Sequence, residues 1–249
     1  MIKNKDKPFP LVITCALVPQ IEVALSDPKE RLRQYRASIV NWVESRAFSE
    51  IVIVDCTNND ILTAKEIEEL SSNGLKIEQL KFGPEVQVQK RGTSWGVGKI
   101  YEFVVQNSKL VNECDFFATT TGRTFVGNIS SLLKDFDAST NKTYVNRWLS
   151  KGYKRFSPGR ADLRFIIWNK SFFESNIPPL LNTLDDSKGN WIEMVYDEVF
   201  ANSSQIQSFR NLPQVIGQTG HGGGFYDGTN FYRWFVKNLI GKITKAGFY

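Results

Sequence analysis

The sequence predicts a single-domain α/β protein with a mostly parallel central sheet flanked by helices. Its 249 residues suit one ordinary α/β domain, and hydrophobic residues make up 41% of them, enough for a buried core. Two short runs, residues 11–17 and 51–54, are apolar on both faces, which is typical of buried parallel strands. A helical pattern separates them, and this alternation predicts a β-α-β unit.

The first third of the chain repeats this alternation. Residues 27–48 form the first helical pattern, with apolar side chains three and four residues apart, and Asp27 and Pro28 suit its start. The strand at 51–54 runs into a polar turn at 55–60, a second helix is expected over 64–72, and a third strand over 77–82. Repeated β-α-β units are typical of nucleotide-binding proteins.

A glycine-rich basic segment follows. Residues 90–99 contain Lys90, Arg91, Gly92 and Lys99, and they predict a loop that leads into a helix over 100–111. Such a loop suits a phosphate or sugar because glycines let backbone amides approach closely; a helix entry with solvated cations is the alternative. The glycine spacing matches neither the Walker motif nor the dinucleotide fingerprint, so kinase, ATPase and dehydrogenase functions lack their motifs.

The second half of the chain adds further elements. A strand over 115–126 breaks into a polar turn that contains Arg123, another strand is expected over 163–168, and a helix over 191–201. Residues 217–224 predict a flexible glycine loop around His221, the only histidine of the sequence.

Composition limits the classes of function that the chain could have. No run reaches the roughly 18 apolar residues of a membrane span, and the amino-terminal segment does not have the pattern of a signal peptide. The three cysteines are an odd number without metal-site spacing, which favours a reducing cytosol. A net charge of +5 favours an anionic partner, with phosphate, a lipid surface and nucleic acid all open.

Four segments in this order, residues 11–20, 51–60, 91–123 and 185–198, resemble a glycosyltransferase of the GT-A fold, more narrowly the small bacterial enzymes that build lipopolysaccharide O-antigen and capsule. The resemblance implies a Rossmann-like GT-A domain over 1–230, with a nucleotide-binding half at about 1–125 and an acceptor half at about 126–230. It also implies transfer of a sugar from a nucleotide-diphosphate donor, expected to be UDP-linked, to a growing lipid-linked surface glycan.

The resemblance assigns the donor site to several segments. The first strand and its loop would touch the nucleotide, and an acidic residue after the second strand would hold the base or ribose, although a turn or cap role for it stays open. The cations of residues 90–99 and the turn at the end of the 115–126 strand would face the diphosphate, and His221 would contact the donor or lie idle. The expected donor residues are Thr14, Asp55, Lys90, Arg91, Gly92, Lys99, Thr121, Gly122, Arg123 and His221.

A departure from the family concerns the metal. GT-A enzymes carry Asp-x-Asp at the end of the later strand, where a divalent ion binds the donor diphosphate, whereas this strand ends in Thr-Thr-Thr-Gly-Arg. Hydroxyl groups alone hold Mg²⁺ or Mn²⁺ poorly, so we expect Arg123 to neutralise phosphate without a required metal. Mg²⁺ or Mn²⁺ stays open, with Asp115 as its ligand, and a strand-end salt bridge is the alternative role for Arg123.

The acceptor side falls on the helix at 191–201. An inverting transferase needs a carboxylate to take the proton of the acceptor hydroxyl. Glu193 is the first candidate and Asp197, one turn further along the same face, is the reserve; a solvated helix face is the alternative. Trp191 or Tyr196 would stack on an acceptor sugar or belong to the core.

The last segment, residues 231–249, is a basic aromatic tail. Its aromatic and aliphatic side chains gather near one helical face and its cations lie mostly off that face, as in an interfacial helix. Because acceptors of O-antigen and capsule synthesis are lipid-linked, the resemblance gives the tail a purpose at the anionic inner-membrane surface. We therefore expect a cytoplasmic, peripherally membrane-associated enzyme, with packing of the tail on the core as the alternative.

Two rival functions are weaker. A nucleotidyltransferase shares the layout but usually needs a glycine-rich lysine loop after the first strand, and residues 14–20 contain no glycine. A basic nucleic-acid-binding module fits the pI near 9.0, yet Asp and Glu balance the cations locally, so no nucleic-acid partner is expected.

Overall fold

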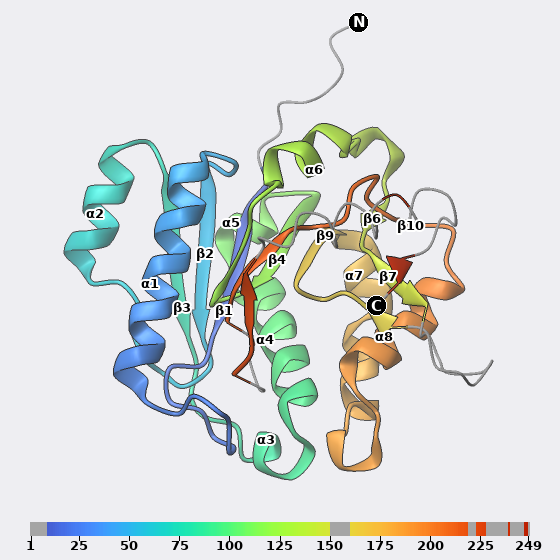
Figure 1. The fold of residues 1–249 in the computed structure, drawn as a ribbon, viewed down its shortest axis with the longest axis horizontal. Coiled ribbons are helices and arrows are strands. Elements are labelled where there is room, and N and C mark those ends of the chain that lie inside the picture. The colour runs from blue at the N-terminus through green and yellow to red at the C-terminus, as the bar shows by residue number, and fades with distance from the viewer. Residues whose placement is uncertain (1–8, 150–159, 219–222, 228–238, 240–246, 249) are drawn as a thin grey trace, which may run out of the picture.

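The computed structural model describes residues 9–149, 160–218, 223–227, 239 and 247–248. A seven-stranded sheet forms the centre (Figure 1). Its strands are β1 (Leu11–Cys15), β2 (Glu50–Asp55), β3 (Lys76–Lys81), β4 (Phe116–Thr121), β6 (Thr143–Tyr144), β9 (Phe165–Asn169) and β10 (Ile206–Gln207). In space they follow the order β10-β6-β9-β4-β1-β2-β3.

The sheet is mostly parallel, as predicted. Strand β1 pairs in parallel with β2 and with β4, and β2 pairs in parallel with β3. Strand β9 lies antiparallel between β4 and β6. The predicted α/β class with a mostly parallel central sheet is therefore confirmed. Because β1 to β4 run in one direction, their carboxyl ends meet at one edge of the sheet.

Helices cover both faces of the sheet (Figure 1). They are α1 (Pro28–Ser45), α2 (Ala64–Ser72), α3 (Val86–Arg91), α4 (Thr93–Asn107), α5 (Lys109–Asn112), α6 (Ile129–Asp135), α7 (Lys170–Asn176) and α8 (Ile192–Ala201). One core joins alternate strand residues such as Val12 to α4, α7 and α8. The other joins their neighbours, such as Ile13, to α1, α2 and α6. Because successive strand side chains point to opposite faces, each apolar strand supplies both cores.

Two small sheets complete the described part. One consists of β5 (Thr124–Val126), β11 (Val215–Gln218) and β12 (Phe225–Asp227), and the other of β7 (Arg147–Leu149), β8 (Arg160–Ala161) and β13 (Gly247–Phe248). The first of them brings residues 215–218 against the turn after β4, because β11 pairs antiparallel with β5.

The glycine-rich segment differs from its prediction. The expected loop over 90–99 is wrong, because α3 ends at Arg91 and α4 begins at Thr93, with only Gly92 between them. Glycine is required at 92 by its positive φ of 93°. Inside α4, a Cβ on Gly98 would lie 2.8 Å from Cδ1 of Leu184. That glycine thus serves close helix packing and not a loop.

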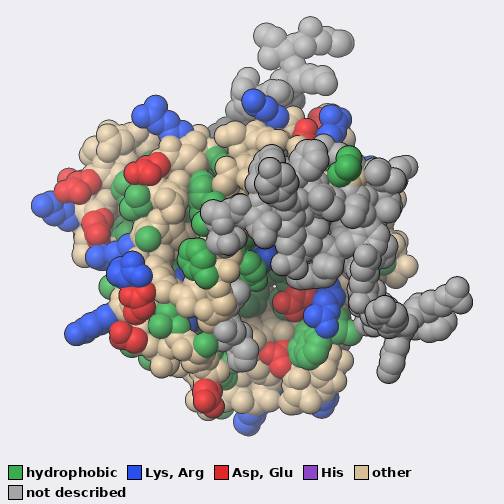
Figure 2. All heavy atoms as spheres, in the orientation of Figure 1, with side chains coloured by type: hydrophobic (Ala, Val, Ile, Leu, Met, Phe, Trp, Pro, Cys, Tyr) green, Lys and Arg blue, Asp and Glu red, His purple; other side chains and the backbone are tan. Residues whose placement is uncertain are grey.

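The described surface carries mixed charge. Lys and Arg side chains are interspersed with Asp and Glu on the face shown in Figure 2, without gathering into one basic patch on it. Among the helices of the described residues, none has the length and apolar character needed to cross a membrane.

Candidate functional site

A pocket with a cavity volume of about 170 Å³ lies at the carboxyl ends of β1 to β4, where open parallel sheets bind ligands. The segments after β1, β2 and β3, the turn between β4 and β5, and residues of α1, α3, α4 and β11 line it. The structure brings five of the predicted donor residues to this pocket. They are Thr14, Lys99, Thr121, Gly122 and Arg123.

The turn between β4 and β5 is packed from several sides. The Gly122 backbone N–H donates to the Thr14 carbonyl at 2.9 Å. On the other side, Gly217 of β11 has a φ of 120°, and a Cβ there would lie 2.1 Å from the carbonyl oxygen of Arg123. Backbone passes on both sides of the turn at distances that only glycine permits, so the direction of the Arg123 side chain is set by the surrounding chain.

Arg123 is 6% exposed although it is an arginine. Its Nη1 donates to Oε1 of Gln34 at 3.4 Å. Burial, followed by the nearby positive charge of Arg31, lowers the pKa of Arg123 from its ordinary value, and it still remains charged because arginine starts so high. The pocket therefore contains a desolvated cation at the point where a diphosphate is expected.

Arg31 is a site residue that the sequence argument missed. It is 5% exposed, comes from the first turn of α1 and lines the pocket beside Tyr35. A signal was present in the sequence, because Arg31 precedes the buried Tyr35 and Ile39 by four and eight residues on the same helix face. A lone cation in a buried apolar stripe is unusual and indicates a function.

Asp55 lies at the end of β2, as predicted, but it is 1% exposed. Its Oδ2 accepts the Leu17 N–H at 2.8 Å, and its Oδ1 accepts the Thr57 N–H at 2.8 Å and the Asn59 N–H at 3.0 Å. The carboxylate thus ties the segment after β1 to the segment after β2. Its direct contact with a base or ribose stays a prediction.

The three cations of the glycine-rich segment lie in different surroundings. Lys99 lines the pocket and forms an ion pair with Glu102 at 2.7 Å, whereas Lys90 is exposed and is not among the lining residues. The Arg91 guanidinium donates to the carbonyl of Asn182. Only Lys99 of this group is therefore placed at the pocket without rearrangement.

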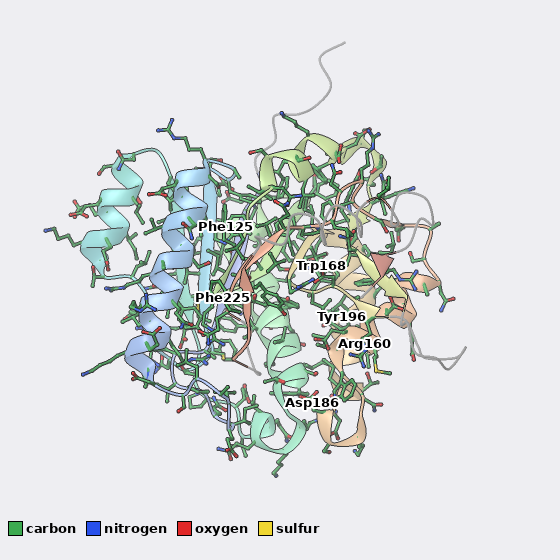
Figure 3. The ribbon with its side chains drawn as sticks, in the orientation of Figure 1. Phe125, Arg160, Trp168, Asp186, Tyr196 and Phe225 are labelled. Carbon is green, nitrogen blue, oxygen red and sulfur yellow. The ribbon has the colours of Figure 1, made fainter. Side chains whose placement is uncertain are left out.

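Gly92 and the start of α4 contact the segment that precedes α8. Oδ2 of Asp186 accepts the Thr93 hydroxyl at 3.0 Å and the Ser94 N–H at 3.2 Å (Figure 3 shows Asp186 at this end of α4). A Cβ on Gly92 would lie 2.2 Å from this same oxygen. Gly92 is therefore needed for the carboxylate to reach the first turn of the helix, where negative charge is stabilised.

Glu193 lies in the first turn of α8 and is exposed. Partial desolvation by the surrounding protein raises the pKa of Glu193, and the negative charge of Asp186 raises it further, against the opposite effects of a backbone hydrogen bond and of Arg160. A carboxylate whose pKa is raised binds a proton more readily near neutral pH. Its accessibility and its pKa suit a general base.

Asp197, the reserve candidate, is 4% exposed and forms a two-point ion pair with Arg147. Arg147 Nε lies 2.7 Å from Oδ1, and Arg147 Nη2 lies 3.0 Å from Oδ2. The structure thus gives Asp197 a partner that ties β7 to α8.

The two aromatic candidates of α8 have different surroundings. Tyr196 is 1% exposed and packs edge-on against Trp168, with ring centroids 6.2 Å apart, within the core. Trp191 is 41% exposed at the start of the helix, and the guanidinium carbon of Arg160 lies 5.1 Å from its ring centroid. Figure 3 shows Arg160 and Tyr196 on the same side of the molecule. Of the two, only Trp191 offers a ring to a ligand.

The residues at the end of β4 do not fit a divalent metal. Within the described residues they offer hydroxyls and a guanidinium, and the cation repels a second positive charge. Asp115 precedes β4 at the opposite edge, and six strand residues at about 3.3 Å each put it roughly 20 Å away. The provisional assignment of Asp115 as a metal ligand at the donor is therefore corrected. Nowhere in the described ranges do three or more His, Cys, Asp or Glu side chains form a metal cluster.

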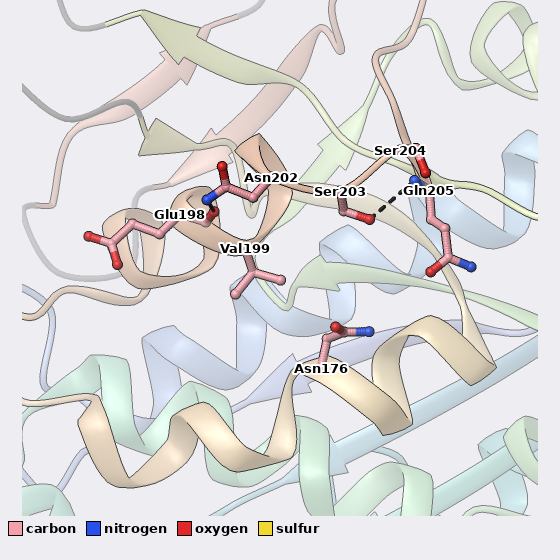
Figure 4. Close-up of a pocket in the computed structure, with 7 residues that line it drawn as sticks. All are labelled: Asn176, Glu198, Val199, Asn202, Ser203, Ser204 and Gln205. Carbon is pink, nitrogen blue, oxygen red and sulfur yellow. Dashed lines mark hydrogen bonds between the residues drawn. The ribbon is translucent and has the colours of Figure 1, made fainter.

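A second hollow, of about 610 Å³, lies at the carboxyl end of α8 (Figure 4). Its side chains are mostly neutral amides and hydroxyls, and Ser203 Oγ accepts the Gln205 N–H at 3.1 Å. None of the predicted site residues lines it. His221 and most of the 231–249 tail lie outside the described residues.

Comparisons with known proteins show which solved structures have a similar fold. No family model matches the sequence, and no curated protein matches it significantly. Among solved structures, the galactosyltransferase LgtC, in complex with donor and acceptor sugar analogues, aligns over 80% of this chain and 73% of its own with a TM-score of 0.52 and 10% identity. The glycosyltransferase GlyE of Streptococcus pneumoniae TIGR4 aligns over 82% and 45%, with a TM-score of 0.51 and 10% identity.

The chain has the GT-A fold. The bifunctional glycosyltransferase WbbM is also similar, with a TM-score of 0.50, 12% identity, and coverage of 96% of this chain and 51% of its own. The chain thus spans about half the length of GlyE and of WbbM. The likeness extends to the fold and assigns no activity.

Proposed function

We propose that this chain is a glycosyltransferase that moves a sugar from a nucleotide-diphosphate donor, of the UDP type, to a growing lipid-linked surface glycan such as O-antigen or capsule. The observation that carries the proposal is the buried Arg123 in a pocket at the strand ends of a GT-A fold. The glycan class rests on the sequence resemblance alone. The enzyme would work in the cytoplasm at the inner membrane.

The donor diphosphate would face Arg123. Negative charge develops on this group as the sugar leaves, and a fixed donor in a desolvated site stabilises it without reorganisation. The guanidinium suits the task because its planar fork makes two parallel hydrogen bonds to phosphate oxygens. Lys99, on the pocket wall, would add a second positive charge once its pair with Glu102 exchanges for phosphate.

The acceptor would approach from the side of α8. Glu193 would take the proton of the attacking hydroxyl, and its exposed carboxyl with a raised pKa supports this role over Asp197, whose carboxylate is held by Arg147. The exposed ring of Trp191 would pack against an acceptor sugar.

A nucleotide screen tests the proposal. Melting temperatures of the full chain are measured with UDP, GDP, CMP and TDP, each with Mn²⁺ and with EDTA. A ligand at 100 times its dissociation constant stabilises the fold by about 2.7 kcal/mol. We expect one nucleoside diphosphate to raise the melting temperature equally with EDTA and with Mn²⁺.

A matched pair of variants completes the test. Arg123→Ala should lose the nucleotide-dependent shift, while Arg33→Ala, at an exposed position of α1, should keep it. Absence of any nucleotide shift in the wild-type chain would contradict the proposed function. A shift that needs Mn²⁺ and disappears in EDTA would contradict the metal-independent form of it.

A further inference from the structure

Arg31 is a buried cation with neutral partners. Its Nε donates to the Ala16 carbonyl at 2.8 Å, its Nη1 to the Leu25 carbonyl at 2.9 Å, and its Nη2 to the Tyr35 hydroxyl at 2.9 Å. These contacts use three of the five N–H groups of a guanidinium. Within the described residues, no carboxylate forms an ion pair with Arg31. Two donors and a full positive charge are therefore left for another group.

The carboxylate of Asp55, at the end of the neighbouring strand, does not form an ion pair with Arg31. Both of its oxygens accept hydrogen bonds from Leu17, Thr57 and Asn59. The charged residues that line the pocket are Glu85 and the three cations Arg31, Lys99 and Arg123. The pocket lining thus has an excess of positive charge.

One face of α1 brings Arg31 to the Arg123 turn. Gln34 accepts from Arg123, and the ring of Tyr35 lies against Gly122, where a Cβ would be 2.7 Å from Cε1. The Tyr35 hydroxyl in turn accepts from Arg31. Residues 31, 34 and 35 belong to one turn of the helix, so both guanidinium groups are held by the same short piece of α1.

The guanidinium groups of Arg31 and Arg123 line the same pocket and repel each other. Buried charges are normally paired, and the charge of Arg31 is strong enough here to lower the pKa of Arg123. An anion between the two groups would give Arg31 a charged hydrogen-bond partner and would screen the repulsion between the two guanidinium groups.

We propose that Arg31 and Arg123 together form a two-arginine site for the diphosphate of the donor, with Arg31 as a second direct phosphate ligand. The inference rests on the proposed function for the nucleotide, but the site itself is defined by phosphate chemistry. Two guanidinium groups on two separate elements suit two linked phosphoryl groups better than a single phosphoryl group. Pyrophosphate should therefore bind more tightly than phosphate. The same arrangement would let a carboxylate-free strand end bind an anion without a divalent ion.

Inorganic pyrophosphate is the probe, with the full chain in EDTA at low salt. Its dissociation constant is measured by calorimetry for the wild type and for Arg31→Gln, Arg31→Lys and the matched control Arg33→Gln. Arg33 lies on the same helix two residues away, with its side chain 69% exposed. Melting curves without anion establish that each variant is folded.

We expect Arg31→Gln to weaken pyrophosphate binding at least tenfold and Arg31→Lys at least threefold, because lysine keeps the charge but loses the fork. Arg33→Gln should stay within twofold of wild type. The preference for pyrophosphate over phosphate should shrink in both Arg31 variants. A folded Arg31→Gln with unchanged pyrophosphate affinity would overturn the inference.

If neither Arg31 variant folds, wild-type crystals soaked in tungstate test the two-arginine site. An anomalous peak within hydrogen-bond distance of both guanidinium groups supports the two-arginine site, and a peak elsewhere or none overturns it. A failure of the proposed function can be distinguished from a failure of the two-arginine site. Pyrophosphate binding without any nucleoside diphosphate preference would refute a nucleotide donor and leave the anion site standing, whereas nucleotide binding that is insensitive to Arg31 would do the reverse.

Discussion

Gly122 lies directly against the ring of Tyr35, since a Cβ on Gly122 would be 2.7 Å from Tyr35 Cε1 and 2.4 Å from the Thr14 carbonyl oxygen. The contact joins the strand-end turn to α1, so the geometry of the pocket at the strand ends depends on the absence of a Cβ at position 122.

Gly122→Ala should therefore displace Arg123 from its position. Overpacking of this kind costs about 1–3 kcal/mol, and a shift of the turn should lower nucleotide affinity at least tenfold. Urea denaturation and calorimetry measure the two effects. Gly189→Ala is the control for a general effect of added methyl groups, because a Cβ there meets nothing within 4 Å, although its positive φ costs some stability. Normal nucleotide affinity in Gly122→Ala would show that the turn is not part of the donor site.

Asp55→Ala should reduce both stability and donor binding. Three backbone N–H donors and the Thr57 hydroxyl would lose their acceptor, which we expect to cost about 2–4 kcal/mol of the free energy of unfolding. Nucleotide affinity should fall at least tenfold because the segments after β1 and β2 line the pocket. Asp60→Ala removes an exposed ion pair with Lys81 and an exposed hydrogen bond from Gln79 Nε2, and it should change stability by less than about 0.5 kcal/mol. Unchanged nucleotide affinity in folded Asp55→Ala would remove Asp55 from the donor site.

Glu193→Gln should lower turnover by about two orders of magnitude and leave nucleotide affinity intact, because the amide keeps the size but cannot take a proton. Glu198→Gln on the exposed side of the same helix is the matched control. A Glu193→Gln enzyme that keeps most of its turnover would transfer the role to Asp197 or Asp186.

The raised pKa of Glu193 also predicts a pH dependence. The base must be ionised, so turnover should rise with pH. The midpoint of this rise should lie at a higher pH than the ordinary pKa of glutamate. Stability should change in the opposite direction. Between the unfolded and the raised folded pKa the native state binds more protons, so the free energy of unfolding falls as pH rises through this window. Denaturation of Glu193→Gln across the same pH range should lack that slope, and identical slopes would contradict the raised pKa.

Deleting residues 231–249 tests the membrane proposal. The truncated chain should no longer float with anionic vesicles, while transfer to a short soluble acceptor should persist, because each of the tail's cations contributes on the order of 1 kcal/mol near an anionic surface. Binding of the full chain should weaken with salt and on neutral vesicles. If the truncated chain unfolds or aggregates, the tail belongs to the core and the membrane proposal fails.

The sequence predicted the elements that depend on local pattern. The apolar runs at 11–17 and 51–54 became β1 and β2, and the spacing of Tyr35, Ile39 and Trp42 became α1, because burial on one or both faces leaves a periodic trace in the chain. The break after Thr121 and the helix that carries Glu193 were predicted for the same reason.

The interpretation of the glycines was less successful, because a glycine serves loops and close packing alike. Gly98 belongs to a helix that approaches Leu184, and only the partner's position reveals this. Similarly, the sequence contains Asp197 and Glu193 one turn apart but gives no sign that Arg147, fifty residues earlier, pairs with one of them.

The sequence by itself determined the α/β class, the parallel order of its first strands and the edge at which Arg123 would stand, because these follow from local hydrophobic periodicity and from the direction of parallel strands. Only the tertiary structure decided that Arg31 shares the pocket and that Asp55 is enclosed. Contacts of this kind join residues far apart in the chain, and their energy depends on burial and distance, which no local pattern encodes.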